Sequence, residues 1–242
     1  MKTRVAKILL LPLITMALPA LAETRVVVLQ TSDGVNLKAS YTSPGRTGPA
    51  MLLIHQCNMD RSSWKAISSD LVASGIHVLA LDLRGFGESG GEGLSSGFPT
   101  LLRKSASDAD LAFDYLVAQS DVDASRMGVG GASCGGMISA DLAVRKENHV
   151  KALMLLSSPP SSSAIQNAAN NSELAVFAAA TKQDPITPGV AGALESMVNG
   201  SANPSSVLRI LDGTEHGLPM FSSNPTLRPE LLNWLKEQLL SD

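Results

Sequence analysis

The chain has 242 residues, with 19 Lys or Arg and 22 Asp or Glu, which gives a formal net charge of −3 at pH 7. Three of the basic groups lie in the first 22 residues, so residues 23–242 carry a formal net charge of −6. This acidic balance argues against a nucleic-acid partner. The 220 residues that follow the first 22 fit one α/β domain, whose core is large enough to need no disulfides.

The first residues are typical of a signal peptide. Met1–Lys7 contains three basic residues, and an apolar stretch of about eleven residues, Ile8–Leu18, follows it. A membrane-spanning helix needs roughly 20 such residues, and Ala20–Ala22 supplies the small residues of a cleavage site. No cysteine stands near Ala22 to take a lipid. We expect cleavage after Ala22, export to the periplasm or the medium, and no stable membrane insertion afterwards; an uncleaved anchor is the alternative.

From residue 23 onward, short aliphatic runs alternate with longer amphipathic segments, a pattern that predicts a mostly parallel sheet with helices on both faces. The turn sequence Ser32-Asp33-Gly34 separates the first two runs and predicts an antiparallel hairpin. We predict one domain over residues 23–242, with eight strands and six helices. The predicted strands cover residues 25–31, 36–42, 51–55, 76–83, 127–131, 152–157, 174–180 and 207–211.

Residues 159–171 form the one low-complexity stretch, rich in Ser, Asn and Pro. At about a dozen residues it is too short for a lid domain, so we expect no lid and an open site. The sequence shows neither an internal repeat nor a second domain.

Gly131-Ala132-Ser133-Cys134-Gly135 is a G-x-S-x-G pattern at the junction of a predicted strand and a predicted helix. In that context the pattern predicts a sharp turn that exposes Ser133 as a nucleophile, with glycines where a Cβ would collide with neighbouring segments. A turn that only packs, or that holds a phosphate, is the alternative. A serine hydroxyl needs a base to take its proton and an acid to orient that base, and here both should follow the serine in the chain.

His216 is the histidine that meets this requirement. Of the four histidines, His55 and His77 belong to earlier strands, and His149 precedes a strand rather than following one. His216 lies in a loop after the last predicted strand, where the carboxyl ends of parallel strands build sites. The acid should end the preceding strand, and Asp184 stands there, followed by Pro185.

Asp212 and Glu215 are alternative acids. For Asp184 itself, the alternative is a plain Asp-Pro turn.

These residues resemble the α/β-hydrolase family, and more loosely its lidless, dienelactone-hydrolase-like members. The resemblance spans nearly all of residues 23–242. It includes the segment Asp82–Ser89, which is similar to the family's D-x-R-G-x-G-x-S loop, and the pairs Asp184-Pro185 and His216-Gly217. The resemblance implies an α/β-hydrolase fold and hydrolysis of ester, thioester or related acyl bonds without a cofactor. We predict no metal site.

In this family, the oxyanion is held by backbone N–H groups of the residue after the nucleophile and of the loop after the third strand. In this chain those residues are Cys134 and Cys57. The family usually has His-Gly in that loop, whereas this chain has His55-Gln56-Cys57, so we expect Gln56 to intrude on the pocket. We expect His55 to be structural.

Because both cysteines then converge on one oxygen atom, they are close enough for a disulfide, and an exported protein meets an oxidising compartment. Our hypothesis is a Cys57–Cys134 disulfide that fixes the oxyanion hole; two buried free thiols are the alternative. A rival hypothesis makes Cys134 the nucleophile, as in dienelactone hydrolases. It would require Ala132 to replace the family's first glycine.

The function that this sequence favours is an exported carboxylesterase or acyl hydrolase acting on small or medium-sized ester substrates. A serine peptidase of related fold is a second candidate, which would need a carboxylate cluster such as Glu88 with Glu92 to anchor a substrate amine. A noncatalytic binding protein that keeps the fold is the third. The ordered Ser133, Asp184 and His216 argue against this last class. Substrate and oligomeric state are not predicted.

Overall fold

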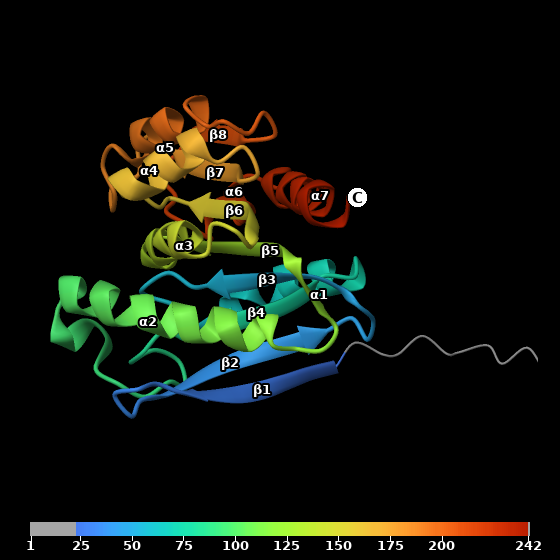
Figure 1. Cartoon of the computed structure of the whole chain (residues 1–242). Helices are drawn as coiled ribbons and strands as arrows, with labels where there is room; N and C mark the ends of the chain where they lie inside the picture. The colour runs from blue at the N-terminus through green and yellow to red at the C-terminus, as the bar shows by residue number, and fades with distance from the viewer. Residues whose placement is uncertain (1–22, 242) are drawn as a thin grey trace, which may run out of the picture.

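The computed structural model describes residues 23–241, so the expected signal peptide, residues 1–22, lies outside the described residues. The described chain forms one sheet of eight strands in the order β1-β2-β4-β3-β5-β6-β7-β8, with helices packed on both faces (Figure 1). β1 pairs antiparallel with β2, β2 pairs antiparallel with β4, and every other pair in the sheet is parallel. The strands are β1 (Glu23–Gln30), β2 (Asn36–Ser43), β3 (Gly48–Ile54), β4 (His77–Leu81), β5 (Val122–Ala132), β6 (Val150–Leu156), β7 (Ala175–Thr181) and β8 (Val207–Leu211).

The helices divide between the two faces of the sheet, because each buries its apolar residues against one of two core clusters. One cluster holds buried residues of α2, α3, α4 and α5, and the other holds those of α1, α6 and α7. β3 and β7 are buried along their whole length, as expected of strands covered on both faces. The helices are α1 (Lys65–Ala73), α2 (Phe98–Val117), α3 (Cys134–Arg145), α4 (Ser162–Asn170), α5 (Val190–Asn199), α6 (Met220–Ser223) and α7 (Leu227–Leu240).

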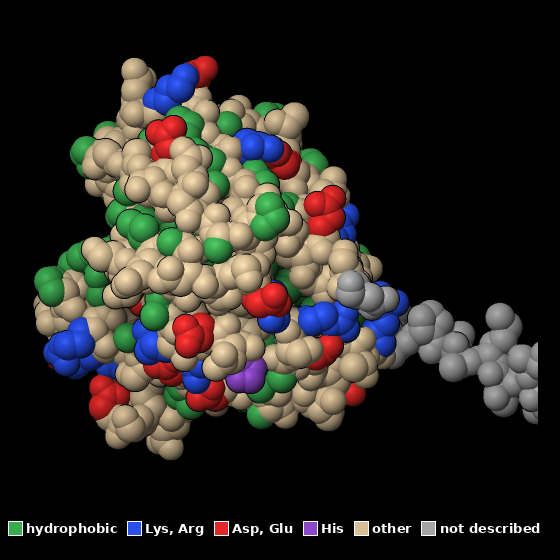
Figure 2. Space-filling model, turned by 45° about the horizontal axis from the view of Figure 1, so that its top comes forward, with side chains coloured by type: hydrophobic (Ala, Val, Ile, Leu, Met, Phe, Trp, Pro, Cys, Tyr) green, Lys and Arg blue, Asp and Glu red, His purple; other side chains and the backbone are tan. Residues whose placement is uncertain are grey.

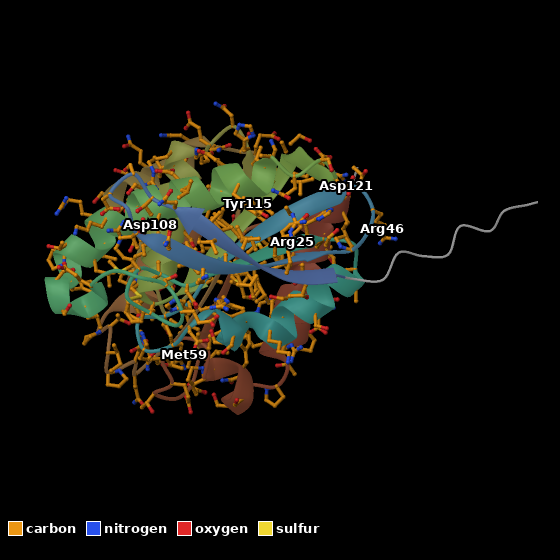
Figure 3. All side chains as sticks on the ribbon, turned by 90° about the horizontal axis from the view of Figure 1, so that it is seen from below. Arg25, Arg46, Met59, Asp108, Tyr115 and Asp121 are labelled. Atoms are coloured by element: carbon orange, nitrogen blue, oxygen red, sulfur yellow. A yellow bond between two sulfur atoms is a disulfide. The ribbon has the colours of Figure 1, made fainter. Side chains whose placement is uncertain are left out.

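The predicted hairpin forms, with Gly34 at φ +83° in its turn. β1 is an edge strand of the sheet, and Arg25 ties it to helix α2 by donating to the Tyr115 hydroxyl at 3.2 Å and to Gln119 Oε1 at 2.6 Å. Figure 3 shows the Arg25 and Tyr115 side chains at the junction of the hairpin and α2. The antiparallel pair thereby extends the parallel sheet on the side away from β8.

The eight predicted strands are all present, with bounds shifted by a few residues, but the helix count was wrong. The described residues contain seven α-helices and two short 3₁₀ helices, η1 (Arg61–Trp64) and η2 (Gly93–Ser96). The low-complexity stretch, treated as irregular, holds helix α4. Its start is capped by Ser161, whose Oγ accepts the Ala164 N–H at 3.1 Å. No described helix is long and apolar enough to cross a bilayer.

Two histidines are buried in the sheet as neutral rings. At His55 the ring Nε2 accepts the Leu83 N–H at 3.0 Å, and Nδ1 lies 2.8 Å from the Gln56 carbonyl oxygen. His77 Nδ1 lies 2.7 Å from the Tyr41 hydroxyl, and its Nε2 lies 3.0 Å from the Arg46 carbonyl oxygen. Burial lowers the pKa of both imidazoles, against smaller raising effects of their carbonyl partners. His55 is therefore structural, because its ring links the ends of β3 and β4.

Because both pKa values are lower in the folded chain than in the unfolded chain, the unfolded state binds more protons as the pH falls below about 6.5. We expect the free energy of unfolding to keep its maximum value above that pH. At lower pH it should decrease, by up to about 1.4 kcal/mol per pH unit for each histidine. Urea unfolding at pH 7.5, 6.5 and 5.5 measures this. His77→Gln should flatten the slope. Equal stability at all three pH values would contradict the prediction.

Candidate active site

Ser133 lies on the sharp turn between β5 and α3. Its backbone has φ +51° and ψ −125°, a conformation that non-glycine residues rarely adopt and that often marks a functional position. A Cβ on Gly131 would lie 2.6 Å from the Ile54 carbonyl oxygen, and one on Gly135 would lie 2.3 Å from the same atom. Both glycines are therefore required for the close packing of the turn against β3. The turn leaves the Ser133 side chain partly exposed at the carboxyl edge of the parallel strands.

Asp184 and His216 are brought together by the loops that follow β7 and β8. His216 Nδ1 lies 2.7 Å from Asp184 Oδ2. The other carboxylate oxygen, Oδ1, accepts the backbone N–H groups of Ile186 at 2.9 Å and Thr187 at 3.0 Å. Burial raises the pKa of the Asp184 carboxyl, but the hydrogen bonds from His216 and from the two N–H groups outweigh it, so the pKa is lowered overall. Asp184 is thus held as a carboxylate that orients the imidazole.

The opposite ring nitrogen of His216, Nε2, is buried and has no hydrogen-bond partner among the described residues. A buried polar atom without a partner is uncommon in folded proteins. The histidine loop packs on the nucleophile turn, because a Cβ on Gly217 would lie 3.4 Å from the Ala132 Cβ. The structure therefore places His216 next to the segment that carries Ser133.

The alternative acids do not contact the histidine ring. Asp212 is exposed and pairs with Lys182 at 2.7 Å. Glu215 Oε2 accepts the Thr214 N–H at 3.1 Å. Asp184 is the carboxylate that this arrangement pairs with His216.

Cys57 and Cys134 form a disulfide, with their Cα atoms 5.9 Å apart. Neither residue's backbone N–H donates a hydrogen bond within residues 23–241. The bond thus links two segments whose N–H groups at Cys57 and Cys134 have no hydrogen-bond acceptor in the described chain, and one of them follows Ser133 directly. The disulfide also argues against Cys134 as the nucleophile, because a sulfur bonded to another sulfur has no thiolate with which to attack.

The expectation that Gln56 intrudes on the pocket was wrong. Its side chain is 3% exposed and is directed at the histidine loop, where Oε1 accepts the Leu218 N–H at 3.0 Å. Sequence reasoning also missed Ser157, whose Oγ accepts the Gly217 N–H at 3.0 Å. Ser157 is, with Ser133, one of two non-glycine residues with positive φ in the described chain. No residue pattern marked either role, since both depend on where a distant loop folds.

The loop Asp82–Ser89 is held by buried charges rather than left open for a ligand. Asp82 is fully buried, accepts the Arg61 N–H at 2.7 Å, and pairs with the Arg61 guanidinium. The same guanidinium pairs with Glu88. Because Glu88 is already neutralised by Arg61, the carboxylate cluster that a peptidase would need for a substrate amine is weakened.

A groove of about 880 Å³ lies elsewhere, between α1 and β2. Its lining includes Ser40, Thr42, Ser68 and Arg61. Ser133, Asp184 and His216 are not part of its lining, so the groove is separate from the candidate site. The described residues contain no group of three or more His, Cys, Asp or Glu placed to hold a metal ion.

Comparison with known proteins agrees with this architecture. The sequence model described as the alpha/beta hydrolase fold matches residues 49–194. An uncharacterized protein of Mycobacterium tuberculosis is 34% identical over 137 residues, which cover 56% of this chain and 45% of that protein. The chain thus matches less than half the length of this curated relative.

Two solved structures share the fold. The esterase Pf2001 of Pyrococcus furiosus has a TM-score of 0.70 at 17% identity and covers 90% of this chain and 92% of its own. A dienelactone hydrolase from Anabaena variabilis has a TM-score of 0.72 at 16% identity and covers 90% of this chain and 99% of its own. Identities this low show the fold alone. With the family match over more than half of the sequence, the chain belongs to the α/β-hydrolase fold family.

Proposed function

We propose that this chain is an exported serine hydrolase that cleaves carboxylic ester or related acyl bonds of small or medium-sized substrates. The observation that carries the proposal is the buried, unpartnered Nε2 of His216. Asp184 orients the ring through Nδ1 at 2.7 Å, and the histidine loop packs at Gly217 against Ala132, the residue before Ser133. The esterase and the dienelactone hydrolase that share the fold support the reaction class.

In the proposed reaction, Ser133 Oγ attacks the substrate carbonyl carbon while its proton moves to His216 Nε2. The carbonyl oxygen becomes an oxyanion that accepts hydrogen bonds from the N–H groups of Cys57 and Cys134. The intermediate collapses, the alcohol leaves with the proton from Nε2, and an acyl-enzyme remains. Water then attacks the acyl-enzyme carbonyl carbon while one of its protons moves to His216 Nε2. The bond to Ser133 Oγ breaks, Oγ takes that proton, and the acid is released.

The experiment that tests the proposal is labelling of purified residues 23–242 with a fluorophosphonate, followed by peptide mapping and by assay of p-nitrophenyl acetate hydrolysis. Adduct on Ser133 together with ester hydrolysis supports it. If Ser133 is not labelled and no ester is hydrolysed, a noncatalytic binding protein is the better explanation. Labelling of Ser133 with cleavage of peptides but not of esters would favour the peptidase.

The surface around the site favours substrates with an apolar part. Among exposed large apolar side chains, Leu94 (48% exposed) lies in η2, Phe98 (42%) begins α2, and Ile186 (66%) lies in the loop after β7. These segments follow the carboxyl ends of β4 and β7, and Ser133 follows the carboxyl end of β5. Figure 2 shows hydrophobic side chains around a hollow on the left of the molecule, the side at which the parallel strands end in Figure 1. Exposed apolar side chains around a hollow offer a surface that an apolar part of a substrate can cover.

Ile186 is the member of this set closest to the chemistry, since its own N–H binds Asp184. We expect Ile186→Ser to raise KM for p-nitrophenyl hexanoate several-fold while leaving the kinetics on the acetate ester within twofold, because only the longer acyl chain reaches this side chain. Val28→Ser, on exposed β1, is the matched control. Equal effects of Ile186→Ser on both esters would refute a role in substrate preference.

A further inference from the structure

The His216 loop between β8 and α6 has no regular structure, so its position depends on individual contacts. Before the histidine, the Glu215 carbonyl oxygen accepts the Thr181 hydroxyl at 2.9 Å. After it, two consecutive N–H groups, those of Gly217 and Leu218, donate to side chains in the segments that follow β6 and β3. A histidine that acts as a base needs this support, because small displacements of a proton acceptor slow proton transfer strongly.

Gln56 provides one of these supports. Its amide is buried, with Oε1 accepting the Leu218 N–H at 3.0 Å and Nε2 donating to Asn58 Oδ1 at 2.7 Å, so both ends of the amide are assigned. The loop closes tightly on it, because a Cβ on Gly217 would lie 2.3 Å from Gln56 Oε1. Gly217 itself has φ +68°. The glycine after the histidine is therefore matched to the glutamine side chain.

Ser157 provides the other support. It follows β6 with φ +49°, a conformation that is uncommon for a serine and that survives only where the surroundings enforce it. Its N–H donates to the Ala179 carbonyl oxygen at 2.8 Å, which fixes the backbone, and its fully buried Oγ accepts the Gly217 N–H. The unusual backbone thus aims a hydroxyl at the main chain beside His216.

Gln56 also connects the histidine loop to the other half of the site. The next residue, Cys57, is bonded to Cys134, and Cys134 follows Ser133 in the chain. One short segment therefore contacts the histidine loop through Gln56 and the nucleophile turn through Cys57.

We infer that Gln56 and Ser157 are positioning residues for His216, which hold the main chain after the histidine so that Nε2 faces Ser133. The inference rests on the proposed function of Ser133 and His216. It assigns to the Gln56-Cys57 segment the joint placement of the base, the nucleophile turn and an oxyanion donor.

The test compares Gln56→Met, which keeps the size of the side chain but loses the acceptor, with Gln56→Glu, which keeps an acceptor for Leu218. Ser157→Ala is compared with Ser206→Ala, a matched control that removes a hydroxyl accepting the Val176 N–H at 3.0 Å at the opposite edge of the sheet. We expect Gln56→Met and Ser157→Ala to lower kcat on p-nitrophenyl acetate 10- to 100-fold, with KM within twofold and an altered pH profile. Gln56→Glu should recover part of kcat, and Ser206→Ala should match the wild type.

A second measurement does not need activity. The His216 Nδ1 proton, hydrogen-bonded to Asp184, should give a slowly exchanging NMR signal in the wild type that broadens in Gln56→Met and Ser157→Ala but not in Ser206→Ala. If folded Gln56→Met and Ser157→Ala keep the wild-type kcat, pH profile and proton signal, the inference is wrong. If the wild type is neither labelled nor active, the proposed function fails, and the proton signal alone still decides whether these residues hold the loop.

Discussion

Ser133→Ala is expected to lower kcat on p-nitrophenyl acetate by at least about 10⁴-fold and to abolish fluorophosphonate labelling, because the attacking oxygen is removed. The folded state should be kept, since the Ser133 backbone is held by its N–H bond to the Leu156 carbonyl oxygen at 2.8 Å rather than by its side chain. Steady-state kinetics, labelling and thermal unfolding on the same preparations measure these effects. Ser163→Ala, at an exposed position on α4, is the control.

His216→Ala should cost about as much as Ser133→Ala, and the double variant should be no slower than either single variant, because the two side chains act as a unit. Asp184→Asn should cost roughly 10⁴-fold, because an amide at Oδ2 favours the wrong tautomer of the imidazole. Asp212→Asn should leave kcat unchanged, since its carboxylate pairs with Lys182. A Ser133→Ala variant that keeps the wild-type kcat would rule out Ser133 as the nucleophile.

The parts of this molecule that could be predicted are those that short stretches of sequence encode. The strands were predictable because a strand buried on both faces, such as Met51–Ile54 within β3, must be a continuous apolar run. The pairing of Asp184 with His216 was predictable because both residues follow adjacent parallel strands, whose ends meet at one edge. The roles of Ser133, Asp184 and His216 in catalysis, the signal peptide and export stay predictions.

The parts that were missed depend on contacts between distant segments. The buried residues of helix α4 are Ala164, Asn167 and Ala168, so its Ser- and Asn-rich sequence contains no run of large apolar residues that would mark a helix. Gln56 contacts Leu218 across 162 positions of the chain, and Ser157 contacts Gly217 across 60. A polar residue beside a predicted site can face the substrate or the scaffold, and only the fold decides between them.

We expect the disulfide both to stabilise the fold and to support catalysis, and the two effects can be measured separately. It joins residues 77 positions apart, so in the chain-entropy model it restricts a long loop of the unfolded state. It also joins the two residues whose N–H groups are proposed to bind the oxyanion, Cys57 and Cys134. Loss of the bond should therefore affect the free energy of unfolding and, independently, kcat.

Reduction of the wild type is the cleanest perturbation, because no residue is changed: the S–S bond is replaced by two thiols. We expect the free energy of unfolding to fall by about 4 kcal/mol. We also expect kcat on p-nitrophenyl acetate to fall by roughly 10²-fold, the cost of losing one oxyanion donor, with little change in KM. Urea unfolding and kinetics with and without a phosphine reductant measure both effects, and reoxidation should restore them.

Cys57→Ala/Cys134→Ala, which has no cysteine left to reduce, is the control: its stability and kcat should not respond to the reductant. Reduced wild type that unfolds more easily but keeps kcat would show that the bond only stabilises the fold. If the reduced wild type keeps both its free energy of unfolding and its kcat, the disulfide neither stabilises the fold nor supports catalysis. A loss of kcat while the protein is still fully folded is the result that assigns the disulfide to the chemistry, because under those conditions the placement of the Cys57 and Cys134 N–H groups is what has changed.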